Sequence, residues 1–260
     1  MPTPLPEAAL PDAPLADAPL LEVQGLSKRY GGLIANNGVT LRLARGEIRG
    51  LIGPNGAGKT TLVNLITGIE TADAGRIRLG DVELGGRPAH AIAAQGLIRT
   101  FQVARVFENL SVRDNLLLPF LAAGSPGGLA AGRTRLAELL ALSTLAALAD
   151  DRAGTLSGGQ RMLLQACAGF MVPGVSLHVL DEPFAGINPV VKDTLIQLIR
   201  RENRSHACTF LIVSHEMDIV RRLCPLVSVM IEGAIAAEGR LDEVARRADV
   251  IAAYLGGNAA

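Results

Sequence analysis

Short apolar runs are the clearest feature in the pattern of hydrophobic and polar positions. Residues 175–180 place apolar side chains on both faces instead of alternating, which is typical of a buried parallel strand. The mostly apolar segments 48–52 and 210–214 predict two more strands. Residues 60–67 predict a helix that Gly68 ends at the C-terminal cap position. These elements together indicate an α/β fold.

Other segments follow different periods. Residues 22–26, the alternating residues 39–43 and residues 75–84 predict antiparallel strands. Residues 104–165 are rich in Ala and Leu, and their leucines at 136, 139, 140 and 148 have helical spacing, which predicts a small helical subdomain with these leucines in its core. We expect its Gly- and Pro-containing interruption, residues 124–132, to be a surface loop.

A glycine-rich string joins the strand at 48–52 to the helix that follows it. It reads Gly-Pro-Asn-Gly-Ala-Gly-Lys-Thr over residues 53–60 and fits the pattern G-x-x-x-x-G-K-[ST]. Glycines allow a phosphate to approach the backbone amides closely, while Lys59 would reach the outer phosphates and the Thr60 hydroxyl would bind Mg²⁺. An ordinary Gly-rich turn is the alternative, but the strand–loop–helix setting favours nucleotide binding.

Two further strings lie downstream. Leu-Ser-Gly-Gly-Gln, residues 156–160, suits a helix N-terminus, where free amides and the helix dipole attract an anion. Leu-Asp-Glu-Pro, residues 180–183, places Asp181 and Glu182 at the end of the predicted parallel strand, where α/β sheets build their sites. Taken alone, each string is also explained by a capped helix start.

The three strings in this order resemble those of the ATP-binding subunits of ABC transporters, and the resemblance covers roughly residues 21–256. It implies a P-loop NTPase (RecA-like) α/β core, an antiparallel β subdomain and an α-helical subdomain at about 104–165. It also implies ATP and Mg²⁺ as cofactors. In that family the Leu-Ser-Gly-Gly-Gln signature binds the γ-phosphate of ATP held by the opposite subunit, so that ATP joins two copies.

The resemblance also assigns roles to single residues. It implies catalytic roles for Glu182 as the base, His215 and Gln102, and metal binding by Thr60, Gln102 and Asp181. The residues that would bind the nucleotide are Tyr30, Gly53, Pro54, Asn55, Gly56, Ala57, Gly58, Lys59, Thr60, Thr61, Ser157, Gly158, Gly159 and Gln160. Without the family, a residue such as Gln102 is usually a solvated loop residue, and one such as His215 is usually a satisfied polar side chain. The alternative for Tyr30 is an aromatic ring packed on a loop instead of on adenine.

Within the family the chain is most similar to the Liv-type ATPases of branched-chain amino-acid importers. The similar pieces are residues 50–53, 65–68, 99–102, 185–189 and 253–256. Residues 149–155 contain no Glu, unlike many exporters, which favours import. The chain departs from the pattern at Leu163 and Ala168, where many relatives carry arginines, and at Asn188, where the wider family has Asp.

This resemblance implies partners and a location. We expect a second ATPase subunit, identical or homologous, integral membrane permease subunits, a substrate-binding protein, and a peripheral position on the cytoplasmic face of the inner (plasma) membrane. Two alternatives remain open: the ATPase of a lipid or lipopolysaccharide exporter, and a soluble ABC-type ATPase of an assembly machine.

Composition limits these readings further. Lys and Arg together number 25, as do Asp and Glu, and no basic tract exists, so nucleic acid is not an expected partner. The three cysteines lack metal-ligand spacing and suit buried thiols in a reducing compartment. The longest apolar stretch, 116–131, is interrupted by Pro and Gly and predicts no membrane span. Residues 1–20 hold six of the fourteen prolines and predict a disordered tail, and residues 257–260 a second short tail.

Overall fold

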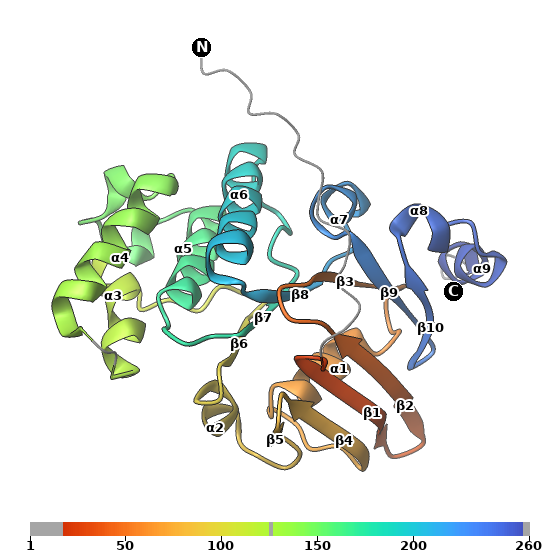
Figure 1. Cartoon of the computed structure of the whole chain (residues 1–260). Helices are drawn as coiled ribbons and strands as arrows, with labels where there is room; N and C mark the ends of the chain where they lie inside the picture. The colour runs from red at the N-terminus through yellow and green to blue at the C-terminus, as the bar shows by residue number, and fades with distance from the viewer. Residues whose placement is uncertain (1–17, 125–126, 257–260) are drawn as a thin grey trace.

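Two β-sheets organise the chain, as Figure 1 shows. The computed structural model describes residues 18–124 and 127–256, so most of the expected N-terminal tail and all of the tail at 257–260 lie outside the described residues. The strands are β1 (Leu21–Tyr30), β2 (Leu33–Leu43), β3 (Ile48–Ile52), β4 (Ala74–Leu79), β5 (Val82–Glu83), β6 (Leu97–Thr100), β7 (Leu177–Asp181), β8 (Thr209–Val213), β9 (Leu226–Ile231) and β10 (Ala234–Gly239). The α-helices are α1 (Lys59–Ile66), α2 (Ala89–Ala93), α3 (Val112–Ala122), α4 (Gly128–Leu142), α5 (Gly158–Phe170), α6 (Pro189–His206), α7 (Met217–Leu223), α8 (Leu241–Val244) and α9 (Ala248–Gly256).

The larger sheet has the order β10-β9-β3-β8-β7-β6, and all of its pairs are parallel except β9 with β10. The strands predicted at 48–52, 175–180 and 210–214 are confirmed as β3, β7 and β8. Because β3 and β7 both pair with β8, their carboxyl ends lie at the same edge of the sheet. This edge receives the phosphate loop and the Asp181–Glu182 pair.

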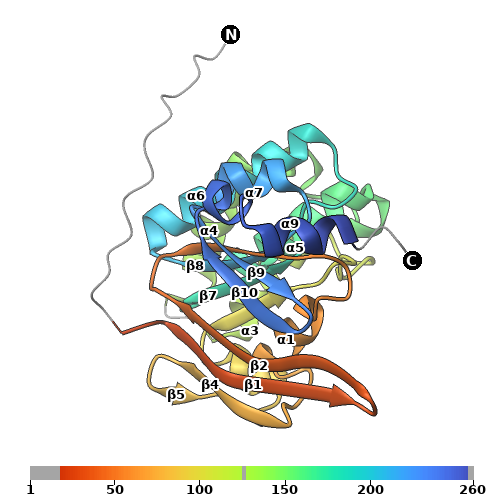
Figure 2. The same cartoon turned by 90° about the vertical axis from the view of Figure 1, so that its right-hand side faces the viewer.

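Both faces of this sheet are covered, which explains its continuous apolar strands. On one face, Phe210 and Ile212 of β8 pack with helices α5, α6 and α7. On the other face, Leu211 and Val213 pack with α1 and with the second sheet. Helix α1 therefore lies between the two sheets, as Figures 1 and 2 show.

The smaller sheet has the order β2-β1-β4-β5 and is antiparallel throughout. The antiparallel strands predicted at 22–26, 39–43 and 75–84 are confirmed, and the last of these forms a hairpin whose strands are β4 and β5. The long β1–β2 hairpin lies in the lower part of the molecule in Figure 2, beside the β4–β5 hairpin. Its turn carries Tyr30, whose hydroxyl bonds to Glu70 in the segment after α1.

Helices α3, α4 and α5 form the part of the molecule at the left of Figure 1. Leu136, Leu139 and Leu140 of α4 are buried, in agreement with the predicted core stripe. Leu148, the fourth leucine of that stripe, lies beyond α4 in a short 3₁₀ turn and is only partly buried. The surface loop expected at 124–132 is wrong in its second half, because α4 begins at Gly128. Good helix formers follow this residue, and the absence of a side chain at Gly132 lets α4 approach α3, since a Cβ there would lie 2.8 Å from Cδ1 of Phe120.

Two further expectations concern the cysteines and a membrane-spanning helix. All three cysteines are free and buried, as predicted, and burial raises the pKa of Cys167 and Cys224 to about 12. Across residues 18–124 and 127–256, no helix combines the length and the apolar character needed to cross a bilayer.

Candidate functional site

The phosphate loop connects β3 to α1 in a conformation that requires glycine. Gly53 has a φ of 151°, and Gly58 has a φ of 95°. A Cβ at Gly53 would lie 2.1 Å from the carbonyl oxygen of Met230, and a Cβ at Gly58 would lie 2.2 Å from that of Ala35. Both glycines are therefore demanded by backbone conformation and by space.

The Lys59 side chain lies across its own loop. Its ammonium donates hydrogen bonds to the carbonyl oxygens of Gly53, at 2.7 Å, and Pro54, at 2.9 Å. Burial lowers the pKa of Lys59, although the nearby carboxylates of Glu182 and Asp181 oppose this effect. Neutral carbonyls are weaker partners for an ammonium than an anionic phosphate is, so the amine can exchange them for phosphate oxygens.

Asp181 and Glu182 lie at the end of β7, as the sequence indicates. Asp181 is 4% exposed, and its Oδ2 accepts a hydrogen bond from Nη2 of Arg99 at 2.6 Å. Glu182 has a φ of 47°, which is uncommon for a residue other than glycine and often marks functional positions. Its backbone amide donates to the carbonyl of Val213 in β8 at 2.9 Å, which fixes this turn to the sheet.

The structure brings His215 to Glu182. Nδ1 of His215 lies 2.9 Å from Oε2 of Glu182, and this Oε2 is buried and accepts no hydrogen bond among the described residues. His215 itself follows β8 and is mostly exposed, so it can contact both the carboxylate and a molecule that approaches from solvent. Glu182, His215 and Lys59 thus face one region at the edge of the parallel sheet.

Metal-ligating groups of the right chemistry are present in the same region. The Thr60 hydroxyl makes no hydrogen bond within the described ranges, and Oδ1 of Asp181 likewise accepts none. Hydroxyl and carboxylate oxygens are ligands that suit Mg²⁺, which commonly keeps several waters and binds substrate phosphates. In keeping with that, no cluster of three or more His, Cys, Asp or Glu side chains forms an all-protein metal cage in the described part of the chain.

Gln102 has no hydrogen bond or ion pair with these groups among the described residues. It is exposed, in the irregular segment after β6, and its side chain makes no hydrogen bond to another described residue. The segment is held from elsewhere: Nε2 of Gln165 donates to the carbonyl of Phe101 at 3.0 Å, and Oε1 of Gln165 accepts from the amide of Arg105 at 2.8 Å. Gln165, on α5, therefore fixes both ends of the loop that carries Gln102.

Sequence reasoning missed Gln165 and Arg99 as contributors to the site. A signal for Gln165 existed in the sequence, because it is a polar residue on the apolar face of an amphipathic helix. The structure shows that its side chain is buried, with 9% of the residue exposed. Arg99 gave no comparable signal, since its partners Asn64 and Asp181 lie 35 and 82 residues away along the chain.

The signature residues begin helix α5 with a capping box. Oγ of Ser157 accepts from the amide of Gln160 at 3.3 Å, and Oε1 of Gln160 accepts from the amide of Ser157 at 2.8 Å. Space around Gly158 is open, whereas a Cβ at Gly159 would lie 3.2 Å from Ile187. No hydrogen bond or ion pair among the described residues joins this motif to the phosphate loop.

Tyr30 lies at the turn of the β1–β2 hairpin with its side chain partly exposed. Its hydroxyl donates a short hydrogen bond to Oε2 of Glu70, which raises the pKa of Tyr30. The Lys28 ammonium lies 5.7 Å from the ring centroid. The ring is thereby held in a defined place near the first turn of α1, where Thr61 also lies.

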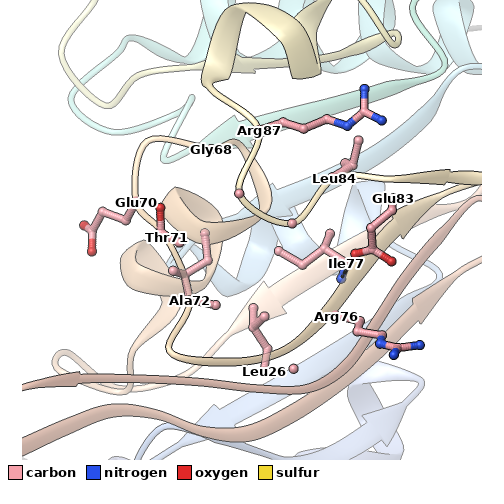
Figure 3. A pocket seen from close by; sticks show the side chains of 14 residues that line it. Leu26, Gly68, Glu70, Thr71, Ala72, Arg76, Ile77, Glu83, Leu84 and Arg87 are labelled. Carbon is pink, nitrogen blue, oxygen red and sulfur yellow. Dashed lines mark hydrogen bonds between the residues drawn. The ribbon is translucent and has the colours of Figure 1, made fainter.

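A hollow of the described surface lies away from these residues. It has a volume of about 500 Å³, and Figure 3 shows it between the β4–β5 hairpin and the segment after α1. Its apolar lining consists of Leu26, Leu65, Ile77 and Leu84, with Glu83 held to the amide of Ile77. No phosphate-loop residue lines it.

Comparison with known proteins identifies the family. Residues 36–185 match the profile of the family described as ABC transporter. The chain is 38% identical over 249 residues to the high-affinity branched-chain amino acid transport ATP-binding protein BraF of Pseudomonas aeruginosa, covering 91% of this chain and 97% of the relative. It shows the same identity and coverage with the corresponding protein LivG of Escherichia coli K12.

A solved structure gives the same answer for the fold. The crystal structure of a nucleotide-free ATP-binding cassette from an ABC transporter superposes with a TM-score of 0.80 at 29% sequence identity, over 91% of this chain and 99% of that chain. The predicted P-loop NTPase fold is therefore confirmed. The chain belongs to the ABC transporter family and is one of its ATP-binding, ATP-hydrolysing cassettes.

Proposed function

We propose that this chain powers the import of branched-chain or related amino acids. The observation that carries the proposal is its 38% identity to branched-chain amino acid transport ATP-binding proteins over 97% of their length. The residues that the sequence singles out for nucleotide chemistry also support it, since several of them lie together at one edge of the parallel sheet.

The proposed site divides its work among named groups. The loop amides of residues 53–60 and the Lys59 ammonium bind the β- and γ-phosphates, and Tyr30 stacks on adenine. Thr60, Asp181 and Gln102 hold Mg²⁺, which supplies charge neutralisation at the transferring phosphate. Glu182 accepts a proton from the attacking water, and His215, 2.9 Å from its carboxylate, holds that carboxylate and the water in place.

The free N-terminus of α5 at the signature supports a dimeric site. Ser157, Gly158 and Gly159 present a helix N-terminus with open space around Gly158, and the capping box leaves this end ordered. In the proposed dimer, the signature of each subunit contacts the ATP bound to its partner. Permease subunits would then receive the motion, with the chain peripheral on the cytoplasmic face of the membrane and a substrate-binding protein supplying the amino acid.

Copurification tests this function most directly. The tagged chain, isolated gently from its own membranes, should bring with it two permeases, a second ATPase and a substrate-binding protein. The ligand of that binding protein, measured by calorimetry, should be Leu, Ile, Val or a related amino acid. Permeases without a binding protein would favour the lipid or lipopolysaccharide exporter instead, and purely soluble partners would overturn transport altogether.

A further inference from the structure

A continuous series of hydrogen bonds joins Tyr30 to Asp181. The Tyr30 hydroxyl donates to Oε2 of Glu70, and Oε1 of Glu70 accepts from Nδ2 of Asn64 at 2.7 Å. Oδ1 of Asn64 accepts from Nη1 of Arg99 at 2.6 Å, and Nη2 of Arg99 donates to Oδ2 of Asp181 at 2.6 Å. The series crosses β1, α1, β6 and β7, so it links four elements around the phosphate loop.

The Arg99–Asp181 end of this series is a buried ion pair. The side chains of Arg99 and Asp181 are 8% and 6% exposed. Desolvation of such a pair offsets much of its attraction, so its presence is weak evidence for a role in stability. Nε of Arg99 is also buried and has no hydrogen-bond partner among the described residues, which adds a further cost to the stability of the folded state.

The geometry at Asp181 indicates what the pair does instead. Arg99 holds one carboxylate oxygen, Oδ2, while Oδ1 accepts no hydrogen bond from any described residue. A residue that grips one oxygen fixes the plane of the carboxylate and leaves the other oxygen oriented for a ligand.

Asn64 explains why Arg99 stays in this place. Its amide uses both ends, as acceptor from Arg99 and as donor to Glu70. Asn64 lies one helical turn after Thr60 on α1, so the same face of the helix carries both residues. The helix that presents the Thr60 hydroxyl therefore also positions the arginine beside Asp181.

We propose that Arg99, held by Asn64, is a positioning residue that orients the Asp181 carboxylate toward Mg²⁺, and that Glu70 ties this arrangement to Tyr30. The inference rests on the proposed metal-binding role of Asp181. A positioning role for Arg99 differs from a purely structural one, because its loss changes the Mg²⁺-dependent part of nucleotide binding and not the folding of the chain.

The test measures the dissociation constant of ATP by calorimetry, once with Mg²⁺ and once with EDTA, in a Glu182→Gln background that prevents turnover. Arg99→Gln should reduce the Mg²⁺-dependent gain in ATP affinity by roughly tenfold and leave the affinity in EDTA unchanged. Asn64→Leu, which leaves the buried charges in place, should act in the same direction with a smaller effect. The Mg²⁺-dependent gain in ATP affinity of Arg99→Lys should lie between those of Arg99→Gln and Asn64→Leu. The lysine keeps the charge, but its ammonium cannot contact Asn64 and Asp181 with the planar geometry of arginine.

Arg105→Gln is the matched control. Arg99 and Arg105 both lie over the ring of Phe101, with Cζ atoms 5.2 Å and 4.1 Å from the ring centroid. Arg105 has no hydrogen bond to Asn64 or Asp181, so the Mg²⁺ dependence of Arg105→Gln should match that of the parent. Folding is checked by thermal unfolding of each variant, and Asn64→Leu carries the test if Arg99→Gln does not fold.

Asp181→Asn separates this inference from the proposed site. A lost Mg²⁺ dependence in Asp181→Asn together with a normal one in the folded Arg99 and Asn64 variants would overturn the positioning role and leave the site intact. A tighter Mg²⁺-dependent affinity in Arg99→Gln would also overturn it, because Arg99 would then compete with the metal. Unchanged Mg²⁺ dependence in Asp181→Asn would remove the proposed role of Asp181 and the inference with it.

Discussion

At the scale of single residues, Glu182 combines a buried Oε2, 2.9 Å from Nδ1 of His215, with a left-handed backbone. Glu182→Gln keeps the shape of the side chain and removes its ability to accept a proton. We expect hydrolysis to fall by about a hundredfold or more, which is the scale of general-base catalysis, while ATP binding persists and a closed dimer accumulates. Steady-state phosphate release and size-exclusion chromatography with ATP measure the two effects.

Glu216→Gln is a suitable control for that change. Glu216 is a neighbouring carboxylate that pairs with Lys192 and not with His215. The ATP turnover of Glu216→Gln should stay near the parent value. Near-normal turnover in Glu182→Gln would contradict the assignment of the base.

Tyr30 offers a second residue-scale prediction. Its ring is partly exposed and held by Glu70 and Lys28, so a base can stack on it without rearrangement of the core. Tyr30→Ala should weaken ATP binding roughly tenfold and leave thermal unfolding unchanged, whereas Tyr30→Phe, which keeps the ring, should lie within about threefold of the parent. Equal affinities for the Ala and Phe variants would argue against stacking.

The residues that the sequence could and could not reveal differ in the range of their interactions. Gly53, Gly58 and Lys59 belong to one local string whose spacing already specifies a phosphate loop. Arg99 and Asn64 act through partners on other elements, and only the folded chain brings them together. A single sequence contains no record of such pairings, so the positioning residues of the site stayed hidden.

At the scale of elements, α5 connects two parts of the site. Its N-terminus carries the signature, and Gln165, within the same helix, holds the loop of Gln102 by hydrogen bonds to Phe101 and Arg105. A displacement of the helix will therefore move this loop. The chain thus has a direct mechanical link between the signature and Gln102.

Gln165→Met tests that link because it keeps a long side chain and removes both hydrogen bonds. We expect the amides of residues 101–105 to exchange hydrogen faster, by roughly tenfold for a loss of about 1.4 kcal/mol, and the kcat for ATP to fall while the KM changes little. Hydrogen-exchange mass spectrometry and steady-state kinetics measure these effects. Gln197→Met, at an exposed position of α6, is the control, and equal exchange in both variants would contradict the link.

Element prediction succeeded where the pattern was strong and local. The strands β3, β7 and β8 are continuous apolar runs because helices or a second sheet cover both faces, and that is the pattern used to find them. The start of α4 was missed because Gly128 and Gly132 suggest a loop. Gly132 lies within the helix because α4 packs closely against Phe120 of α3 at this position. This contact depends on tertiary structure and cannot be found in the local sequence.

At the scale of the whole molecule, the parallel sheet separates two hydrophobic cores, and His178 lies in one of them. It stacks on Phe210 at a centroid distance of 5.0 Å and meets the edge of Phe170 at 5.2 Å. Desolvation by burial lowers the pKa of His178 from 6.5 to about 3. The folded chain therefore keeps this imidazole neutral at a pH at which an unfolded chain binds a proton.

The sign of the resulting pH dependence follows from linkage. Between about pH 6.5 and 3 the unfolded state binds one more proton at His178 than the folded state does, so stability falls as the pH falls through this window. The full effect has a slope of about 1.4 kcal/mol per pH unit once the unfolded imidazole is protonated. Above pH 6.5 this contribution is constant.

We therefore expect His178→Leu to flatten the loss of stability between pH 6.5 and 5, even if it lowers stability at neutral pH through lost ring contacts. Urea unfolding at pH 7.5, 6.5, 5.5 and 5.0 gives the slopes, and the comparison depends on their difference and not on the absolute stability. His90→Asn, which changes an exposed histidine on α2, should leave the slope of the parent unchanged. Parallel curves for His178→Leu and the parent would mean that His178 is protonated in the folded state at these pH values, and that its ring is not held neutral by the core.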